Sequence, residues 1–402
     1  MIYSKVVVFL FSIISLISLN LAINPLIILH ALKYICLFIL IILGIIDKEF
    51  QNIPAYPKRI IIIYWLYSIF IITYGLTLSE SYWDYKNIFT RYVPGVFISF
   101  VIFIGLELEK NLSLFRFIIK IIFPITFIVG TISYLFYYES FYYFNYDNTI
   151  SRLTAPIFFF ILAMPFLKRN YQLFIIFMSI FCITIDLEWR TNILRLSVCW
   201  SFVLIYFLSL LKKRLLNFIG IIIFVTPLIF LYSGISGKFD IFKYISKDDK
   251  SIWSGNTRTF LYEEVFESIK NKNTSLLIGG GASAGYQSIY FSDDKISLNA
   301  EQDRYKAEAR FLNALNQSGI IGVILDMLLL FIPGYFAINR SNNSFSKLLG
   351  LYLFFSWPLY FLEMPLVLNL NYFLYYFIIG LCLSNSLRKS NDKQIKSFFK
   401  SI

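Results

Sequence analysis

The residues best suited to chemistry lie where a charged stretch enters a long apolar one, between residues 308 and 326. Glu308 supplies a carboxylate that can exchange a proton, and Arg310 supplies a planar guanidinium that stays charged and can bind phosphates through paired hydrogen bonds. Because Arg310, Asn313 and Gln317 are spaced three and four residues apart, they share one face of a helix. A polar stripe on a membrane helix normally faces a cavity or a partner helix rather than lipid.

A second face of the same stretch carries Gly319, Gly322 and Asp326. The two glycines allow a neighbouring helix to approach closely. Asp326 lies deep in the apolar run, where an unpaired or dehydrated carboxylate is costly. We therefore expect Asp326 to make a structural hydrogen bond.

A run of three glycines, Gly279, Gly280 and Gly281, ends an apolar stretch further upstream. It is not a P-loop, because no Lys-Ser/Thr pair follows it. Two interpretations stay open: a flexible turn, or backbone N–H groups that line a phosphate or sugar pocket. On the second interpretation the three glycines are candidate substrate-binding residues.

The elements that must position these residues are membrane helices. The chain is 58% hydrophobic, 20% aromatic and 15% charged, which is the composition of a polytopic membrane protein. It divides into about twelve apolar segments, each long enough for a helix to cross a bilayer core of roughly 30 Å. The segments are 5–22, 25–46, 60–79, 92–108, 115–137, 153–167, 171–187, 191–211, 215–233, 312–338, 346–363 and 366–387. The expected fold is all-α, with about twelve transmembrane helices.

Basic residues mark every second connection between these segments, as in Lys212, Lys213 and Arg214. The positive-inside rule then places both termini in the cytoplasm. Residues 1–233 hold the first nine helices, 234–310 form one large outer loop, and 311–402 hold the last three helices and a basic cytoplasmic tail. The net charge of +12 follows from this topology. It favours an anionic lipid surface as the neighbour and calls for no nucleic acid.

The outer loop is the part of the chain able to form a small water-exposed subdomain. One stretch of it is expected to be an amphipathic helix, for which Asn256 or Thr257 could serve as the cap. Its apolar face is given by Phe260, Leu261, Val265, Phe266 and Ile269.

The sequence contains no pattern that indicates a metal site or a disulfide framework. The four cysteines lie within apolar segments at spacings that fit no metal site, and a single histidine cannot form a histidine cluster. We expect neither a metal nor another cofactor.

Three short motifs follow one another along the chain: Gly255-Asn-Thr-Arg258, Ile278-Gly-Gly-Gly281, and Glu308-Ala-Arg-Phe-Leu312 continuing to Gly319-Ile-Ile-Gly322. Together with the large outer loop after the ninth helix, they resemble the Wzy-type O-antigen polymerases and their relatives, the O-antigen ligases. Ligases of this superfamily usually carry histidine where this chain has Glu308, so the resemblance favours a polymerase.

The resemblance implies a GT-C-like membrane glycosyltransferase in the bacterial inner membrane. Such enzymes act on undecaprenyl-diphosphate-linked glycans at the outer leaflet, invert the anomeric centre and need no metal. Partners implied in the same way are membrane lipids and, from the same pathway, a chain-length regulator and a flippase.

The resemblance also implies roles for individual residues. Glu308 would be the general base for the acceptor hydroxyl, and Arg258 and Arg190 would stabilise the leaving diphosphate. Further candidates for substrate binding are Arg310, Arg195, Arg304, Asn313 and Lys33.

Structural alternatives exist for several of these residues. Arg190 and Lys33 could be side chains that snorkel from helix ends. Arg258 could pair with an acid on the adjoining helix, and Glu308 could pair with Arg304 four residues before it.

Two rival functions stay open at the sequence level. The first is an O-antigen ligase, which transfers finished glycan to lipid A core. The second is a polysaccharide flippase or another transporter, which should show two related halves and broken helices near the membrane midplane. We find no internal repeat in the sequence.

Overall fold

The computed structural model describes residues 2–23, 27–46, 48–136, 152–185, 190–235, 259–272, 274–287, 304–305, 307, 309–362 and 368–402. Nearly all of these residues are helical, and apart from two isolated bridges no β-structure occurs among them. The fold is therefore an all-α fold, as the sequence predicts.

The first half of the chain begins with two helices and a short 3₁₀ turn, followed by a long helix α3. The bounds are α1 Ile2–Ile23, α2 Ile27–Ile46, η1 Lys48–Asn52 and α3 Ala55–Leu78. The next two predicted segments are composite helices with π and 3₁₀ turns inside them. They comprise α4 Tyr82–Asn87, η2 Ile88–Tyr92, α5 Val93–Phe97, η3 Ile98–Phe100, α6 Val101–Gly105, η4 Glu109–Asn111, α7 Leu112–Phe117, η5 Ile118–Ile122 and α8 Phe123–Phe136.

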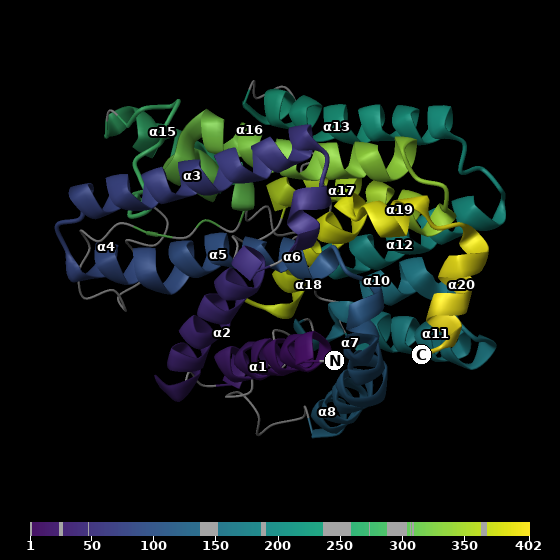
Figure 1. Cartoon of the computed structure of the whole chain (residues 1–402). Coiled ribbons are helices and arrows are strands. Elements are labelled where there is room, and N and C mark those ends of the chain that lie inside the picture. Colours follow the sequence, from purple (N-terminus) through teal and green to yellow (C-terminus); the bar gives the residue numbers. More distant parts are fainter. Residues whose placement is uncertain are drawn as a thin grey trace.

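The rest of the chain contains several longer single helices and the shorter elements α10, η6, α19 and α20. The bounds are α10 Pro156–Ala163, η6 Met164–Phe166, α11 Arg169–Ile185, α12 Arg190–Phe207, α13 Lys213–Ile235, α15 Thr259–Asn271, α16 Arg310–Asn339, α17 Ser344–Leu362, α18 Leu370–Leu383, α19 Asn385–Lys389 and α20 Asp392–Lys400. Helix α16, in the upper part of the molecule in Figure 1, packs against α3, α13, α17 and α18.

Each of the twelve predicted segments coincides with one of these helices or with a run of consecutive helices. Among the described residues, five helices are long and apolar enough to cross a membrane: Ala55–Leu78, Tyr82–Gly105, Leu112–Ile132, Arg310–Asn339 and Ser344–Leu362. Six further apolar helices are shorter. The structure is thus that of a helical membrane protein, and the crossing of the bilayer by all twelve segments stays a prediction.

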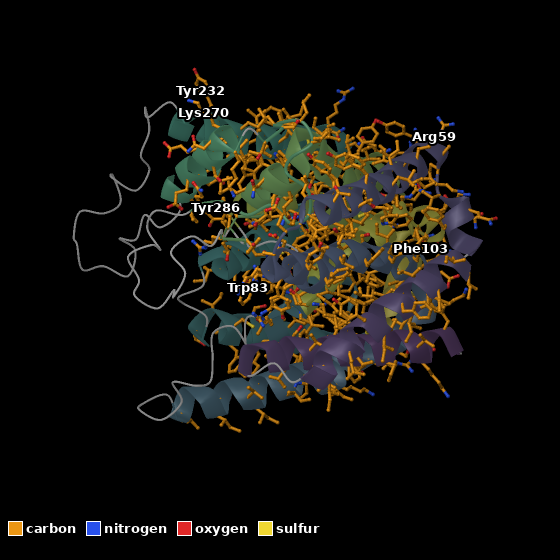
Figure 2. All side chains as sticks on the ribbon, turned by 90° about the vertical axis from the view of Figure 1, so that its left-hand side faces the viewer. Arg59, Trp83, Phe103, Tyr232, Lys270 and Tyr286 are labelled. Atoms are coloured by element: carbon orange, nitrogen blue, oxygen red, sulfur yellow. The ribbon has the colours of Figure 1, made fainter. Side chains whose placement is uncertain are left out.

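Residues that the predicted topology places outside gather on one side of the molecule. Trp83, Tyr232, Lys270 and Tyr286 lie toward the left of Figure 2, whereas Arg59 lies toward the right. In Figure 1, α4 and α15 lie at the left end of the molecule and α19 and α20 at the right end. Which of these two ends faces the cytoplasm stays a prediction from the alternating basic connections.

The amphipathic helix expected in the outer loop is present as α15. Its residues Leu261, Val265 and Ile269 are buried in the same core as the membrane helices. The Tyr262 hydroxyl donates a hydrogen bond to the Phe361 carbonyl at 2.9 Å. The described part of the loop therefore shares the core of the helical body instead of having a core of its own. Asn256 and Thr257, the predicted caps, lie outside the described residues.

Helix α16 breaks at Gly319, whose φ of +62° and ψ of −166° are not helical. The break separates a first half, residues 310–318, from a second half, residues 320–339. A left-handed φ is readily adopted only by glycine. In an apolar setting a broken helix is tolerated only where other groups satisfy the freed backbone atoms.

Residues 274–287, which we call the glycine loop, supply most of those groups. The Gly280 and Gly281 N–H groups donate to the Asn316 and Gln317 carbonyls at 2.9 and 3.0 Å. On the other side of the break, the Ile320 and Ile321 N–H groups donate to the carbonyls of Leu276 and Leu277, at 3.0 and 3.2 Å. The glycine loop therefore caps both broken ends of α16.

Candidate functional site

A cavity with charged walls, the charged cavity, lies beside the break in α16. The space open to water inside it is about 100 Å³. It is enclosed by α3, by the composite helix α4–η2–α5, by Tyr305 and by both halves of α16. Its lining residues are Tyr64, Tyr67, Ser68, Asn87, Arg91, Tyr92, Gly95, Val96, Tyr305, Arg310, Asn313, Ala314, Gln317, Ser318, Gly322, Leu325 and Asp326.

An ion pair joins the two halves of α16 across the cavity. The Arg310 Nη2 lies 2.9 Å from the Asp326 Oδ1, and both side chains are almost fully buried. These residues are 16 positions apart, which in a straight helix would separate them by about 24 Å along the axis. The break at Gly319 must therefore turn the first half back toward the second, because only then can the pair form.

Tyrosines hold this ion pair in place. The Tyr360 hydroxyl donates to the Asp326 Oδ2 at 2.7 Å. The Arg310 guanidinium carbon lies 4.9, 5.8 and 5.3 Å from the ring centres of Tyr360, Tyr372 and Tyr375. Cation–π contacts of this kind gain strength where water is excluded. Arg310 is thus a fixed cation whose position depends on Asp326 and on the aromatic rings of α17 and α18.

Arg91 is a second cation in the lining, and it lies in the π-helical turn η2. No carboxylate of the described residues lies within ion-pair distance of Arg91. Helix α2 braces this turn, because the Lys33 Nζ donates to the Thr90 carbonyl at 2.6 Å and the Tyr34 hydroxyl donates to the Phe89 carbonyl. A π turn widens a helix by one residue and often occurs at functional sites. In this protein the π turn η2 forms part of the wall of the charged cavity.

The remaining polar groups of the wall are mainly phenols and an amide. The Tyr67 hydroxyl donates to the Ser318 carbonyl at 2.7 Å, and the Tyr305 hydroxyl donates to the Asp84 Oδ1 at 2.8 Å. The Asn87 amide donates to the Ala282 carbonyl at 3.2 Å. With Arg310 and Asp326 neutralising each other, Arg91 gives the described wall a net positive charge. Such a wall suits an anionic ligand that also carries hydroxyl groups or an apolar face.

The three glycines of the predicted phosphate or sugar pocket have another role in this structure. The Gly279 N–H donates to the Ser275 carbonyl at 2.7 Å, and those of Gly280 and Gly281 donate to α16. These amides are therefore engaged within the protein and are not presented to a ligand. Gly279 and Gly281 are needed for other reasons: both have positive φ, and a Cβ at either would lie within 2.7 Å of another backbone atom.

Of the predicted substrate-binding side chains, Arg310 and Asn313 line the charged cavity. The Asn313 amide is used as a local cap, since its Nδ2 donates to the Ala307 and Ala309 carbonyls and its Oδ1 accepts from the Ala307 N–H. Asn313 therefore shapes the start of α16 at the edge of the cavity.

Three other predicted substrate-binding residues do not line it. The Lys33 Nζ donates its hydrogen bond to the Thr90 carbonyl of η2. Arg304 exchanges two backbone hydrogen bonds with Tyr286, at 2.8 and 2.9 Å. Arg195 is buried, with its guanidinium 4.7 Å from the ring centre of Phe158.

The predicted catalytic residues fall outside what the structure describes. Glu308 and Arg258 lie outside the described residues, and Arg190 begins α12 with a side chain that is not described. Two residues close to Glu308 in the sequence, Tyr305 and Arg310, line the charged cavity. The structure thus leaves the three catalytic assignments as predictions.

Sequence reasoning missed Arg91 and the tyrosines of α3 and α18. In the sequence, Arg91 is simply a basic residue in the short connection before the predicted segment 92–108. The available signal was its place directly before the predicted segment 92–108, a place that a snorkelling arginine at a helix end shares. Among the 29 tyrosines of the chain, no spacing in the sequence distinguishes Tyr64 or Tyr372 from the rest.

In the part of the chain that the structure describes, no group of three or more His, Cys, Asp or Glu side chains lies close enough together to hold a metal ion. Comparison with protein-family models, with curated proteins and with solved structures found no match to this chain.

Proposed function

We propose that this protein is an O-antigen polymerase, a membrane glycosyltransferase that joins lipid-diphosphate-linked oligosaccharide units at the outer face of the bacterial inner membrane. The observation that carries the proposal is the charged cavity, which combines a buried fixed cation, Arg310, with Arg91 and a wall of phenols. The resemblance of the Glu308-to-Gly322 motif to this superfamily supports the same reading, because that motif forms one wall of the cavity from Arg310 onward.

The chemistry divides into two tasks. The leaving diphosphate gains negative charge as the glycosidic bond breaks, and fixed cations aimed at that charge stabilise the transition state. Arg91 and Arg310 suit this task, and Arg258 and Arg190 are the further candidates that the resemblance implies. The acceptor hydroxyl must lose a proton, and Glu308 is the proposed base. The phenols of the wall can donate hydrogen bonds to sugar hydroxyls and offer rings for stacking.

A second candidate function is a carrier for an anionic glycolipid. The break in α16 favours it, because discontinuous helices whose ends meet an ionised cavity are typical of secondary transporters. The two candidates differ in one requirement. A polymerase needs only its lipid substrates, whereas a carrier needs two compartments.

The first test uses the purified protein in detergent with lipid-linked repeat units. Formation of longer glycans in this single compartment supports the polymerase, and a protein that produces none there but moves the lipid across sealed vesicles is a carrier. In cells, a polymerase knockout leaves lipopolysaccharide with core and one repeat unit. Bare core would instead indicate a ligase.

Arg91→Lys tests the role of the second cation. We expect polymerisation to fall by about 10²-fold, because an ammonium group cannot reproduce the paired hydrogen bonds of a guanidinium to a phosphate. Arg59→Lys is the matched control, since Arg59 is exposed at the start of α3 and does not line the cavity. An unchanged glycan ladder in Arg91→Lys cells at native expression would remove Arg91 from the mechanism.

A further inference from the structure

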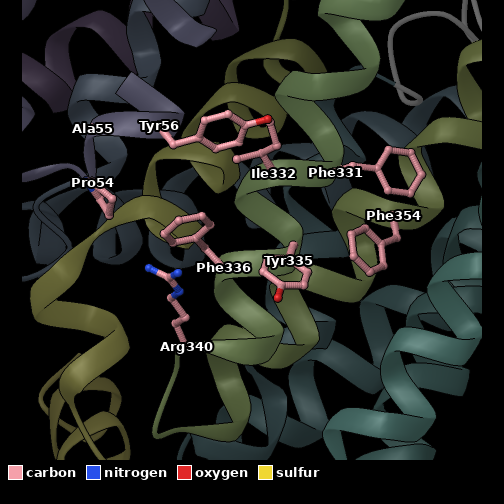
Figure 3. A pocket seen from close by; sticks show the side chains of 9 residues that line it. All are labelled: Pro54, Ala55, Tyr56, Phe331, Ile332, Tyr335, Phe336, Arg340 and Phe354. Atoms are coloured by element: carbon pink, nitrogen blue, oxygen red, sulfur yellow. The ribbon is translucent and has the colours of Figure 1, made fainter. Parts of the chain in front are cut away.

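A larger cavity lies near the other end of α16, between its last turns and the start of α3 (Figure 3). We call it the aromatic groove, and its volume is about 640 Å³. Its wall is almost entirely apolar and includes Tyr56, Phe331, Tyr335, Phe336 and Phe354, with Arg340 at one end. It is remote from the charged cavity and shares none of its lining residues.

Helices α3 and α16 contact each other, and the groove lies between the start of α3 and the last turns of α16. Near the break in α16, the Tyr67 hydroxyl reaches the Ser318 carbonyl. Toward the start of α3, the two helices leave a gap between Tyr56 and Tyr335, whose side chains are 61% and 51% exposed. Both helices are long and apolar enough to span a bilayer, so we expect the apolar part of this gap to face the hydrocarbon of the membrane. An apolar groove at that depth is filled by a lipid chain rather than by water.

The cationic end of the groove lacks a counter-charge. Arg340 is exposed at the end of α16, with its guanidinium carbon 4.5 Å from the ring centre of Phe336. Arg388 of α19 lies 5.5 Å from the same ring and is buried. No carboxylate of the described residues is within ion-pair distance of either arginine, and the buried Nε of Arg388 has no hydrogen-bond partner.

Two cations on one aromatic ring produce a strongly positive spot. Burial, together with the neighbouring Arg340, lowers the pKa of Arg388. An anion bound at Arg340 would relieve this repulsion. The helix dipole of α16 adds only a partial negative charge at the same end.

We infer that the aromatic groove binds one anionic phospholipid, with its phosphate at Arg340 and an acyl chain along the rings of Phe336, Phe331 and Phe354. A single molecule of this class satisfies both features at once: an unpaired cation where the helix ends and an apolar channel that runs from it along the helix. The groove is at the end of α3 where Lys58 and Arg59 lie, and the positive-inside rule assigns that end to the cytoplasmic leaflet.

The test compares lipid binding by Arg340→Gln and Arg214→Gln. Arg214 is an exposed arginine at the start of α13 that does not line the groove, so its variant removes the same charge elsewhere. Native mass spectrometry of the delipidated full-length protein is titrated with phosphatidylglycerol and, separately, with phosphatidylcholine. We expect Arg340→Gln to weaken phosphatidylglycerol binding about five-fold or more and Arg214→Gln to leave it unchanged.

A second variant tests the apolar part of the site. Ala55→Trp places a bulky ring in the groove from an exposed position, and it should remove phosphatidylglycerol binding while the protein keeps its melting temperature. Equal affinity for the two lipids, or equal effects of the two arginine variants, would overturn the inference. Competition by inorganic phosphate alone would overturn it as well, because it would indicate a site for a free anion. Formation of a dimer as lipid is removed would also overturn it, because it would indicate a contact between two copies of the chain.

Discussion

Arg310 illustrates how much one buried charge depends on its surroundings. Its single ion-pair partner among the described residues is Asp326, and three tyrosine rings surround its guanidinium. A buried ion pair adds little net stability relative to apolar residues of the same size, but loss of one partner leaves the other charge uncompensated. Such a pair is therefore better explained by a functional need for a fixed cation than by stability.

Asp326→Asn should cost about 3–5 kcal/mol of unfolding free energy, because it leaves Arg310 buried without a counter-charge. Denaturant titration in a mild detergent measures this loss. Glu107→Gln is the control, since Glu107 pairs with Lys110, whose side chain is 59% exposed, and such a pair is worth about 1 kcal/mol or less. A loss of under about 1 kcal/mol for Asp326→Asn would show that the pair is not buried as described.

The double variant Arg310→Leu with Asp326→Leu separates stability from function. Replacing both charges by apolar groups should restore most of the lost stability. If Arg310 binds the diphosphate, the glycan ladder should still be absent from cells that carry this variant.

At the scale of elements, the break in α16 and the glycine loop depend on each other. The loop supplies the donors and acceptors that both broken ends require, and glycine is the residue that fits between them. A Cβ at Gly319 would lie 2.3 Å from the Leu277 carbonyl oxygen, and its φ of +62° disfavours any other residue.

Gly319→Ala should therefore disrupt the contact between α16 and the glycine loop, and with it the Arg310–Asp326 ion pair. We expect lower thermal stability and loss of polymerisation, with a backbone penalty of about 1–2 kcal/mol before steric effects. Gly280→Ala is the matched control, because its Cβ would meet the nearest side-chain atom at 3.0 Å and need only a small adjustment. Equal behaviour of the two variants in a thermal unfolding assay would contradict the proposed role of the break.

At the scale of the whole molecule, the two cavities lie in different places and have different linings. The charged cavity lies beside the glycine loop near one end, and the aromatic groove lies at the start of α3. Two separate cavities suit a protein whose substrates arrive on one side of a membrane while its basic residues contact lipid on the other side.

A reporter that is active only outside the cytoplasm tests this orientation. Fused within residues 240–300 it should be active, and fused after Arg388 it should be silent, because the basic connections lie on the side of the termini. The reverse pattern at either position would mean that the orientation is wrong.

The sequence by itself determined the kind of fold and the place of its elements. The predicted segment 60–79 coincides with α3 at Ala55–Leu78, and 312–338 coincides with α16 at Arg310–Asn339. This succeeds because the length of an apolar run and the charges beside it are local properties, and the bilayer imposes them on each helix separately.

Only the tertiary structure decided how the candidate site is assembled. The sequence predicts two separate faces for Arg310 and Asp326 on one helix, and the break at Gly319 brings them into contact. The N–H groups of Gly280 and Gly281 donate to carbonyls of α16, which lies more than 30 residues away in the sequence. Lys33 likewise braces η2 from 57 residues away. Contacts between distant residues leave no trace in local composition or spacing, so the side chains that meet in the charged cavity could be identified only once the helices were packed together.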